Sequence, residues 1–179
     1  MGKRSTKGLV MVFTGDGKGK TTAAMGMAMR CAGHGLKCLM IQFIKGGWRY
    51  GELKAAKKLA PYFEMIPMGK GFIRTDRGGP DPEDLKAIRD AWSLFLEKMR
   101  TQNFQMIILD EINNVIQMGL LAPEALLGAV KEKPPEMHLV LTGRNAHPLI
   151  IEVADLVTEM REIKHPFSVG IRAQKGVEY

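Results

Sequence analysis

Residues 12–30 read VFTGDGKGKTTAAMGMAMR, in which glycine-rich turns and two lysines lie between two apolar runs. The apolar residues at its start are typical of a buried strand, and the alanines and methionines after it are typical of a helix. Gly15, Gly17 and Gly19 let the backbone curl so that successive N–H groups point inward beside the amino end of that helix. The stretch therefore predicts a P-loop that binds a polyphosphate.

Side chains in the same stretch extend this prediction. Lys20 would bring a full positive charge to phosphate oxygens, and the Thr21 hydroxyl is placed to ligate a divalent cation, Mg²⁺ or Mn²⁺. The usual spacing would put a first glycine at position 14, where this chain has Thr14. A glycine turn without a ligand would not explain the lysines and threonines. The residues that we expect to contact ATP phosphates are Gly15, Asp16, Gly17, Lys18, Gly19, Lys20, Thr21 and Thr22.

Two further apolar runs end in charged side chains. Residues 105–112, QMIILDEI, read as a strand that ends at Asp110 and Glu111. In P-loop proteins such a strand presents a carboxylate to the metal, and we expect it to lie beside the first strand. A later run ends in TGR, which would bring Arg144 to the carboxyl edge of the sheet, where ligands of open α/β folds bind.

Short apolar runs alternate with longer helical patterns along the whole chain, which predicts an α/β fold. Several of the runs lack polar alternation, as expected for strands buried on both faces of a mostly parallel sheet. The predicted strands are 9–14, 37–44, 63–67, 105–110, 137–142 and 155–160. The predicted helices are 21–32, 51–60, one that begins at 81–82, 123–133 and 148–154. Asp81 is placed to cap the third of these, with Pro82 as its first residue.

Composition favours one domain over residues 1–179, with residues 1–7 as a flexible tail. The chain has 179 residues, of which 45% are hydrophobic. Its apolar runs fall well short of the roughly 20 residues that span a bilayer, and residues 1–7 lead into no signal-peptide core, so we expect a cytoplasmic protein. Cys31 and Cys38 have no neighbouring ligand at metal spacing and are interpreted as reduced packing residues.

The formal net charge of +7 raises the question of an anionic partner. Nucleic acid, a membrane surface and a phosphorylated small molecule would each suit it. Lysines and arginines are spread over the whole chain, however, so we interpret the charge as a solvated surface with one anion pocket. We expect neither a nucleic-acid nor a membrane partner.

A set of motifs, in order from about residue 8 to the end, carries a specific resemblance. They are FTGDGKGKTTAA (13–24), GHG (33–35), QFIKGGW (42–48), LDEI (109–112), LTGRNAHP (141–148), ADLVTEM (154–160) and KHPFSVGIRAQKGVEY (164–179). Together they resemble the P-loop ATP:corrinoid adenosyltransferases of the CobA type. The fold implied is a RecA-like P-loop NTPase domain with a mostly parallel sheet flanked by helices.

The resemblance also implies an unusual use of ATP. Members of this family move the 5′-deoxyadenosyl group of ATP to the Co(I) of a corrinoid, form a carbon–cobalt bond and release triphosphate. They are homodimers, and an electron donor such as a reduced flavoprotein supplies Co(I). Because Co(I) is itself a strong nucleophile, the protein needs no general base, and its task is positioning and charge stabilisation.

Carried over by position, the resemblance assigns roles to individual residues. Lys20, Thr21 and Glu111 are the expected catalytic residues, and Thr21 and Glu111 are the expected metal contacts, with Asp110 as a second carboxylate. Arg30 and Arg144 are expected to reach the nucleotide.

The resemblance places the corrinoid against aromatic side chains. We expect Trp48, Phe72 and Arg74 to contact it. The family's loop carries Phe-x-Trp and helps to displace the lower ligand of the cobalt, whereas this chain has Phe72, Ile73 and Arg74.

Two other functions fit a P-loop. One is a RecA-like ATPase that binds nucleic acid through its positive charge, with Glu111 orienting water. The other is a nucleotide-binding module without chemistry. An ATPase would yield ADP and phosphate without a corrinoid, and a module would yield neither product.

Overall fold

The structure is a computed structural model, and it describes residues 7–46, 50–71, 73, 79–101 and 103–178. Within these residues there are six strands: β1 (Val10–Thr14), β2 (Cys38–Gln42), β3 (Phe63–Pro67), β4 (Met106–Asp110), β5 (His138–Thr142) and β6 (Leu156–Glu159). The helices are α1 (Lys20–Gly33), α2 (Gly51–Lys58), α3 (Pro82–Thr101), α4 (Ile112–Gln117), α5 (Pro123–Glu132), α6 (Pro148–Val153) and the 3-10 helix η1 (Pro166–Val169). All the predicted strands and helices are confirmed, with small shifts of their ends.

The six strands form one sheet in the order β3-β2-β4-β5-β1-β6. Every pair of neighbours is parallel, which confirms the α/β prediction. The expectation that the strand ending at Asp110 lies beside the first strand is wrong, because β5 lies between β4 and β1. Both β1 and β4 pair with β5 over four residues. Because the two strands are similarly apolar, their sequences alone do not specify which strands become neighbours.

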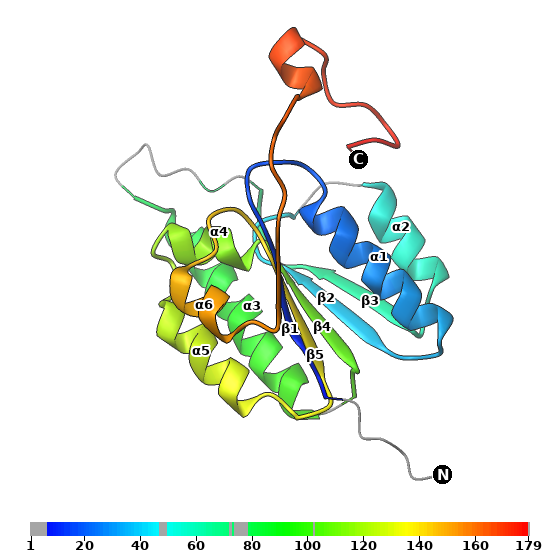
Figure 1. The fold of residues 1–179 in the computed structure, drawn as a ribbon, viewed down its shortest axis with the longest axis vertical. Helices are drawn as coiled ribbons and strands as arrows, with labels where there is room; N and C mark the ends of the chain where they lie inside the picture. The colour runs from blue at the N-terminus through cyan, green and yellow to red at the C-terminus, as the bar shows by residue number, and fades with distance from the viewer. Residues whose placement is uncertain (1–6, 47–49, 72, 74–78, 102, 179) are drawn as a thin grey trace.

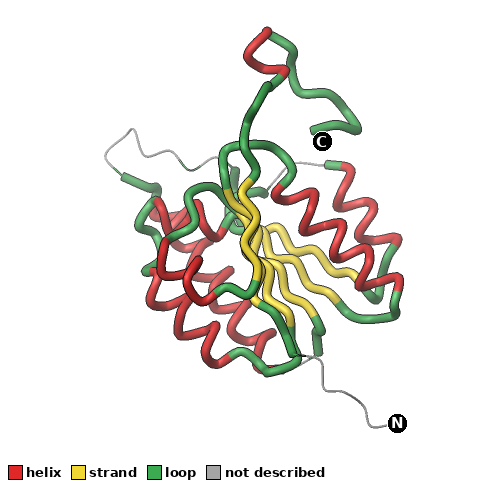
Figure 2. The backbone as a smooth tube through the Cα atoms, in the orientation of Figure 1, coloured by secondary structure: helices red, strands yellow, loops and turns green. Residues whose placement is uncertain are grey.

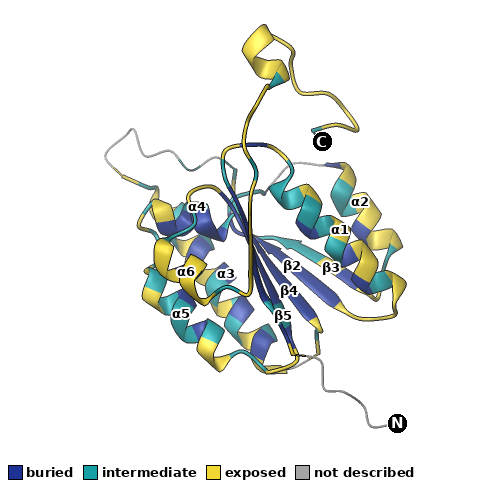
Figure 3. Ribbon diagram, viewed as in Figure 1, coloured by how far each residue is buried: buried dark blue, intermediate teal, exposed yellow. Residues whose placement is uncertain are grey.

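Helices cover both faces of the sheet and make three layers (Figure 1). Helices α1 and α2 lie on one face, and α3, α4, α5 and α6 lie on the other. Side chains of each strand alternate between these layers: in β4, Ile107 and Leu109 pack with the α3 layer, whereas Met106 and Ile108 pack with the α1 layer. Because both faces are covered, β1, β2 and β4 are buried at every residue (Figure 3).

Helix α3 shows how local sequence sets an element. The Asp81 carboxylate accepts a hydrogen bond of 2.8 Å from the Glu83 N–H, and Pro82 is the first helical residue, as predicted. The helix buries Ile88, Ala91, Phe95 and Met99, which recur at helical spacing against the sheet. No described helix is long and apolar enough to cross a bilayer.

Two short helices, α4 and η1, escaped prediction. Helix α4 has six residues and begins directly after Glu111, whose φ of 68° turns the chain at the end of β4. Helix η1 has four residues. Elements of fewer than two turns are too short to show a hydrophobic period, so their sequences do not distinguish them from loops.

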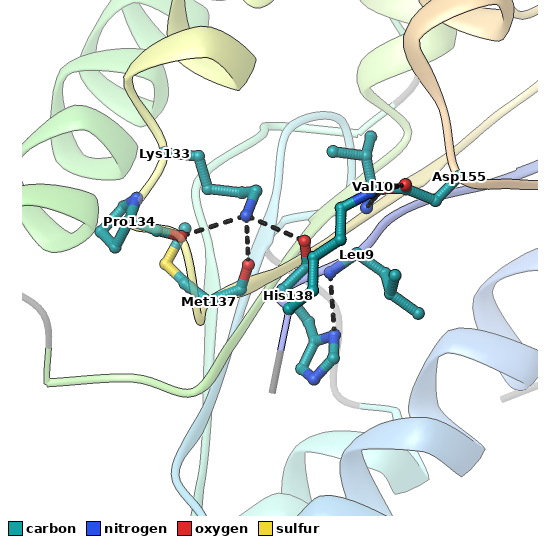
Figure 4. A network of polar contacts seen from close by, with 9 residues as sticks. Leu9, Val10, Lys133, Pro134, Met137, His138 and Asp155 are labelled. Atoms are coloured by element: carbon teal, nitrogen blue, oxygen red, sulfur yellow. Dashed lines mark hydrogen bonds and ion pairs between the residues drawn. The ribbon is translucent and has the colours of Figure 1, made fainter. Parts of the chain in front are cut away.

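The strands β1, β5 and β6 are fastened together at their amino ends by a polar network (Figure 4). Lys133 Nζ donates to the carbonyl oxygens of Gly8, Pro134 and Met137, at 3.2, 3.1 and 2.7 Å. Asp155 Oδ2 accepts from the Val10 N–H at 2.9 Å, and Oδ1 pairs with Lys7, the last residue of the predicted tail. This network holds the amino ends of these strands together, at the end of the sheet opposite the P-loop.

The sheet ends at β6 in an exposed edge, and the chain then leaves the body. All four β6 residues are exposed. After β6 the chain extends away from the sheet, carries η1 and turns back (Figures 1 and 2). We call residues 161–178 the C-terminal segment. Its apolar side chains are exposed: Ile163, Phe167, Val169, Ile171 and Val177.

Both cysteines lie in the layer between the sheet and α1. Cys31 and Cys38 are buried free thiols, as the sequence predicts. Burial raises the pKa of both thiols above the ordinary value, so neither is ionised at neutral pH.

Candidate nucleotide-binding site

The buried polar side chains of the described chain gather at one edge of the sheet. Thr14, Gln42, Asp110 and Thr142 are the last residues of β1, β2, β4 and β5, and Asn113 follows in α4. The carboxyl ends of parallel strands share one edge, so these four side chains meet there. The P-loop crosses the same edge between β1 and α1.

The P-loop glycines are required by their neighbours as well as by a ligand. Gly15 and Gly19 have φ values of 94° and 112°, in the region that favours glycine. The Gly17 N–H donates to the Met160 carbonyl at 2.7 Å, and a Cβ on Gly17 would lie 2.7 Å from the Arg161 carbonyl carbon. The backbone directly after β6 therefore supports the P-loop.

Lys20 lies at the mouth of the loop. Its Nζ donates to the carbonyl oxygens of Gly15 and Gly17, each at 2.6 Å. Partial burial lowers its pKa from the ordinary value, and the Arg144 charge adds to that effect, whereas Asp16 and Glu111 oppose it. The ammonium group is thus held where the loop amides would receive phosphate.

Asp110 is the centre of a buried hydrogen-bond network. Its Oδ1 accepts from Thr21 Oγ1 at 2.9 Å and from Thr142 Oγ1 at 2.7 Å. Its Oδ2 accepts from Gln42 Nε2 at 2.9 Å and lies 4.0 Å from Lys45 Nζ. The carboxylate is fully buried, so these partners take the place of water. Thr142 of β5 spans the gap that separates Asp110 from the first strand.

Glu111 occupies an unusual position beside this network. Its backbone N–H donates to Thr142 Oγ1 at 2.9 Å, whereas its side-chain Oε2 is buried without a hydrogen-bond partner in the described residues. Burial raises its pKa to about 7, with the Asp110 charge as the next cause, while Lys45 and Lys20 act in the opposite sense. Carboxylate and hydroxyl oxygens are the ligands that hard cations prefer, and Glu111 directly follows Asp110, whose carboxylate accepts from the Thr21 hydroxyl. Thr21, Asp110 and Glu111 therefore fit Mg²⁺ or Mn²⁺.

Charged residues from two other segments reach the loop. Arg144 Nε lies 3.7 Å from Asp16 Oδ1, and the Arg144 N–H donates to Asn114 Oδ1 at 3.0 Å. Lys18 Nζ donates to Glu178 Oε1, in the C-terminal segment, at 3.0 Å. Arg144 and the C-terminal segment thus each contact a side chain of the P-loop.

Of the remaining predicted site residues, the structure describes Thr22 and Arg30. Thr22 is exposed in the first turn of α1. Arg30 is exposed in the last turn, about 15 Å along the helix axis from Lys20, so the structure does not bring it to this cluster. Trp48, Phe72 and Arg74 lie outside the described residues.

Sequence reasoning did not identify four residues of the site by their chemistry. Gln42, Lys45, Tyr50 and Thr142 all contact Asp110 or one of its partners. A signal exists for two of them: Gln42 and Thr142 are polar residues that end apolar strands, as Asp110 does. The other two follow β2 in a loop without periodicity.

Comparison with known proteins identifies the family. The family model for ATP:corrinoid adenosyltransferase BtuR/CobO/CobP matches residues 6–179. This chain belongs to that family. A corrinoid adenosyltransferase of Sinorhizobium sp is 42% identical over 181 residues, with 99% of this chain and 83% of the relative covered. Corrinoid adenosyltransferases of Escherichia coli K12 and Salmonella typhimurium LT2 are 36% and 34% identical, and each comparison covers 97% of this chain and 86% of the relative.

Solved structures of other proteins share the fold of this chain. The flagellar accessory protein FlaH of Methanocaldococcus jannaschii aligns with a TM-score of 0.52 at 14% identity, covering 86% of this chain and 71% of FlaH. The KaiC-like protein PH0186 of Pyrococcus horikoshii OT3 gives 0.51 at 17% identity, with 89% and 76% covered. At such identities the likeness concerns the fold alone, and it agrees with the predicted parallel sheet flanked by helices.

Proposed function

We propose that this protein is an ATP:corrinoid adenosyltransferase that moves the 5′-deoxyadenosyl group of ATP to the Co(I) of a corrinoid. Family membership over residues 6–179 is the observation that carries the proposal. The P-loop and the carboxylates at the strand ends supply the parts that such an enzyme needs for ATP.

The chemical step is a displacement at the ribose C5′ of ATP. The substrate's Co(I) donates an electron pair to C5′, a carbon–cobalt bond forms, the C5′–oxygen bond breaks, and its electron pair leaves with triphosphate. Negative charge therefore grows on the leaving group. Lys20 and the amides of the P-loop hold that group and stabilise its charge.

The charged residues around the loop orient the triphosphate. Thr21, Asp110 and Glu111 would hold a divalent cation, which neutralises phosphate charge when bound. Arg144 and Lys18 are paired with Asp16 and Glu178 in this structure, and each would exchange its partner for phosphate oxygens when ATP binds. Arg30 is assigned to the nucleotide by the resemblance.

We further propose a corrinoid contact through Trp48, Phe72 and Arg74, and a homodimer in the cytoplasm. The family resemblance supports these assignments. Exposed apolar side chains on β6, α6 and the C-terminal segment also support a dimer, since large exposed patches mark interaction surfaces. The Co(I) state requires an electron donor, for which a reduced flavoprotein is suited.

An anaerobic assay with ATP and chemically reduced cobinamide or cobalamin tests this function. The absorbance of the carbon–cobalt product should appear, together with triphosphate, only when ATP and the reduced corrinoid are both present. Release of ADP and phosphate without a corrinoid would instead establish the ATPase. Nucleotide binding with no product under either condition would establish a module without chemistry.

A further inference from the structure

Tyr50 and Gln42 form a buried pair that no step above uses. The Tyr50 hydroxyl donates to Gln42 Oε1 at 2.5 Å, and Gln42 Nε2 donates to Asp110 Oδ2 at 2.9 Å. All three residues are buried, with exposures of 8%, 1% and 0%. The chain of hydrogen bonds thus leads from Tyr50, the residue directly before α2, to the carboxylate beside the P-loop.

The direction of these bonds is fixed by chemistry. An ionised Asp110 can only accept, so Gln42 must present its NH₂ group to the carboxylate. The amide oxygen then faces Tyr50, which must donate to it. Burial raises the pKa of Tyr50 to about 12, with the Asp110 charge as a second cause, so the hydroxyl keeps its proton. Each member therefore has one orientation in which every polar atom is satisfied.

We infer that Gln42 and Tyr50 are positioning residues that hold the Asp110 carboxylate so that its Oδ1 faces Thr21 at the cation site. The carboxylate can rotate about its bond to Cβ, and a second attraction exists in Lys45 Nζ, 4.0 Å from Oδ2. Without the Gln42 donor, rotation toward Lys45 would draw the carboxylate away from Thr21. This inference rests on the proposed function, in which Thr21 and Asp110 serve the cation of ATP.

The pair also links two parts of the chain. Gln42 is paired in register with Asp110 through the β2–β4 ladder, whereas Tyr50 precedes α2. The loop between them carries Lys45. A hydrogen bond across this loop fixes its two ends relative to the carboxylate. A substitution at Tyr50 would therefore shift the Asp110 carboxylate, which contacts Thr21 beside the P-loop.

The test measures Mn²⁺ binding to the full-length protein with ATP and without a corrinoid, by electron paramagnetic resonance. Tyr50→Phe should weaken Mn²⁺ binding about 3- to 5-fold, and Gln42→Met about 10-fold or more, because a hydrogen bond to a charged group is stronger than a neutral one. The exposed Tyr62→Phe and Gln117→Met serve as matched controls and should leave the affinity unchanged.

A double-mutant cycle separates positioning from a purely structural role. In a Thr21→Val background, Gln42→Met should cost less Mn²⁺ affinity than in the wild type, because both act through the same carboxylate. Wild-type affinity in Tyr50→Phe and Gln42→Met, or fully additive losses, would overturn the inference. If Gln42→Met fails to fold, as judged by circular dichroism, Tyr50→Phe and its cycle with Thr21→Val decide alone. No Mn²⁺–ATP binding by the wild type would instead contradict the proposed function.

Discussion

Lys20 and Glu111 show how the surroundings of single residues give the site its charge properties. Lys20 begins α1 and Glu111 directly follows β4, and burial lowers the pKa of Lys20 but raises that of Glu111 to about 7. Each shift disfavours the charged form of the side chain. A ligand of opposite charge favours that charged form and so interacts favourably with it. Anionic phosphate would complement Lys20, and a cation would complement Glu111.

Lys20→Ala should lower the rate of adenosyl transfer at least about 100-fold. The substitution removes the positive charge that we propose to hold the leaving triphosphate, and loss of one such donor costs about 2.7 kcal/mol or more. Initial rates with ATP and reduced cobinamide measure the effect. Lys57→Ala, on the exposed face of α2, is the control. Near-normal turnover in Lys20→Ala would contradict its assignment to the phosphates.

Glu111→Gln should change how stability depends on pH in protein freed of metal with EDTA. The folded-state pKa of about 7 lies above the ordinary value of 4.5, so the folded state binds more protons between these values. Wild-type stability should therefore fall as pH rises from 4.5 to 7, by at most about 3 kcal/mol.

Thermal unfolding at pH 5 and pH 8 measures this difference. Glu111→Gln should match the wild type at pH 5 and be more stable at pH 8, whereas the exposed Glu136→Gln serves as a control. An equal difference between wild type and Glu111→Gln at both pH values would show that the carboxyl does not titrate in this range.

At the scale of elements, the P-loop depends on β6 as much as on its own glycines. The backbone after β6 accepts the Gly17 N–H and closes against Gly15 and Gly17. The strand itself is held at its amino end by Asp155 and the Val10 N–H. The last strand in sequence thus supports the first loop of the site.

Two glycine substitutions distinguish this support from ordinary helix propensity. Gly17→Ala should destabilise the protein and weaken ATP binding, because its Cβ would lie 2.7 Å from the Arg161 backbone. Gly26→Ala should stabilise the protein by about 0.5–1 kcal/mol, since Gly26 lies within α1 and an added Cβ would have no atom of the surrounding described residues within 4 Å. Chemical denaturation and nucleotide titration measure both effects. Equal stability of the two variants would show that β6 does not constrain the loop.

At the scale of the whole molecule, apolar exposure is concentrated after residue 148. Ten of the 13 exposed large hydrophobic residues in the described chain follow that position: Leu149, Ile151, Val153, Leu156, Val157, Ile163, Phe167, Val169, Ile171 and Val177. A parallel sheet is normally covered on both faces, yet β6 is exposed along its length. A second copy of the chain would supply the missing cover.

The double variant Phe167→Ser, Val169→Ser should weaken self-association at least about 10-fold. These side chains are 78% and 66% exposed in the single chain, and burying such a side chain is worth about 1.5–3 kcal/mol. Light scattering coupled to size-exclusion chromatography, over a range of concentrations, measures the effect. Leu36→Ser, an exposed position before β2, is the control. A monomeric wild type, or a dimer unaffected by the double variant, would place the interface elsewhere or exclude it.

The sequence by itself determined the P-loop, the strands, the fold class and the family. These follow from local signals: glycine spacing around Lys20, apolar runs of strand length and motifs in a fixed order. The P-loop and each strand can be read within about 20 residues, because phosphate binding by a loop and burial of a strand depend on neighbours in the chain. The fold class and the family follow from the order of such segments along the whole chain.

Only the tertiary structure decided which side chains meet at the site. It inserted β5 between β4 and β1, brought Gln42 to Asp110 and Tyr50 to Gln42, and left Glu111 Oε2 buried without a hydrogen-bond partner among the described residues. Strand order depends on packing energies summed over whole layers, and similar apolar runs leave several orders open. Burial, and with it each pKa shift, is a property of the assembled edge, to which residues from four strands contribute.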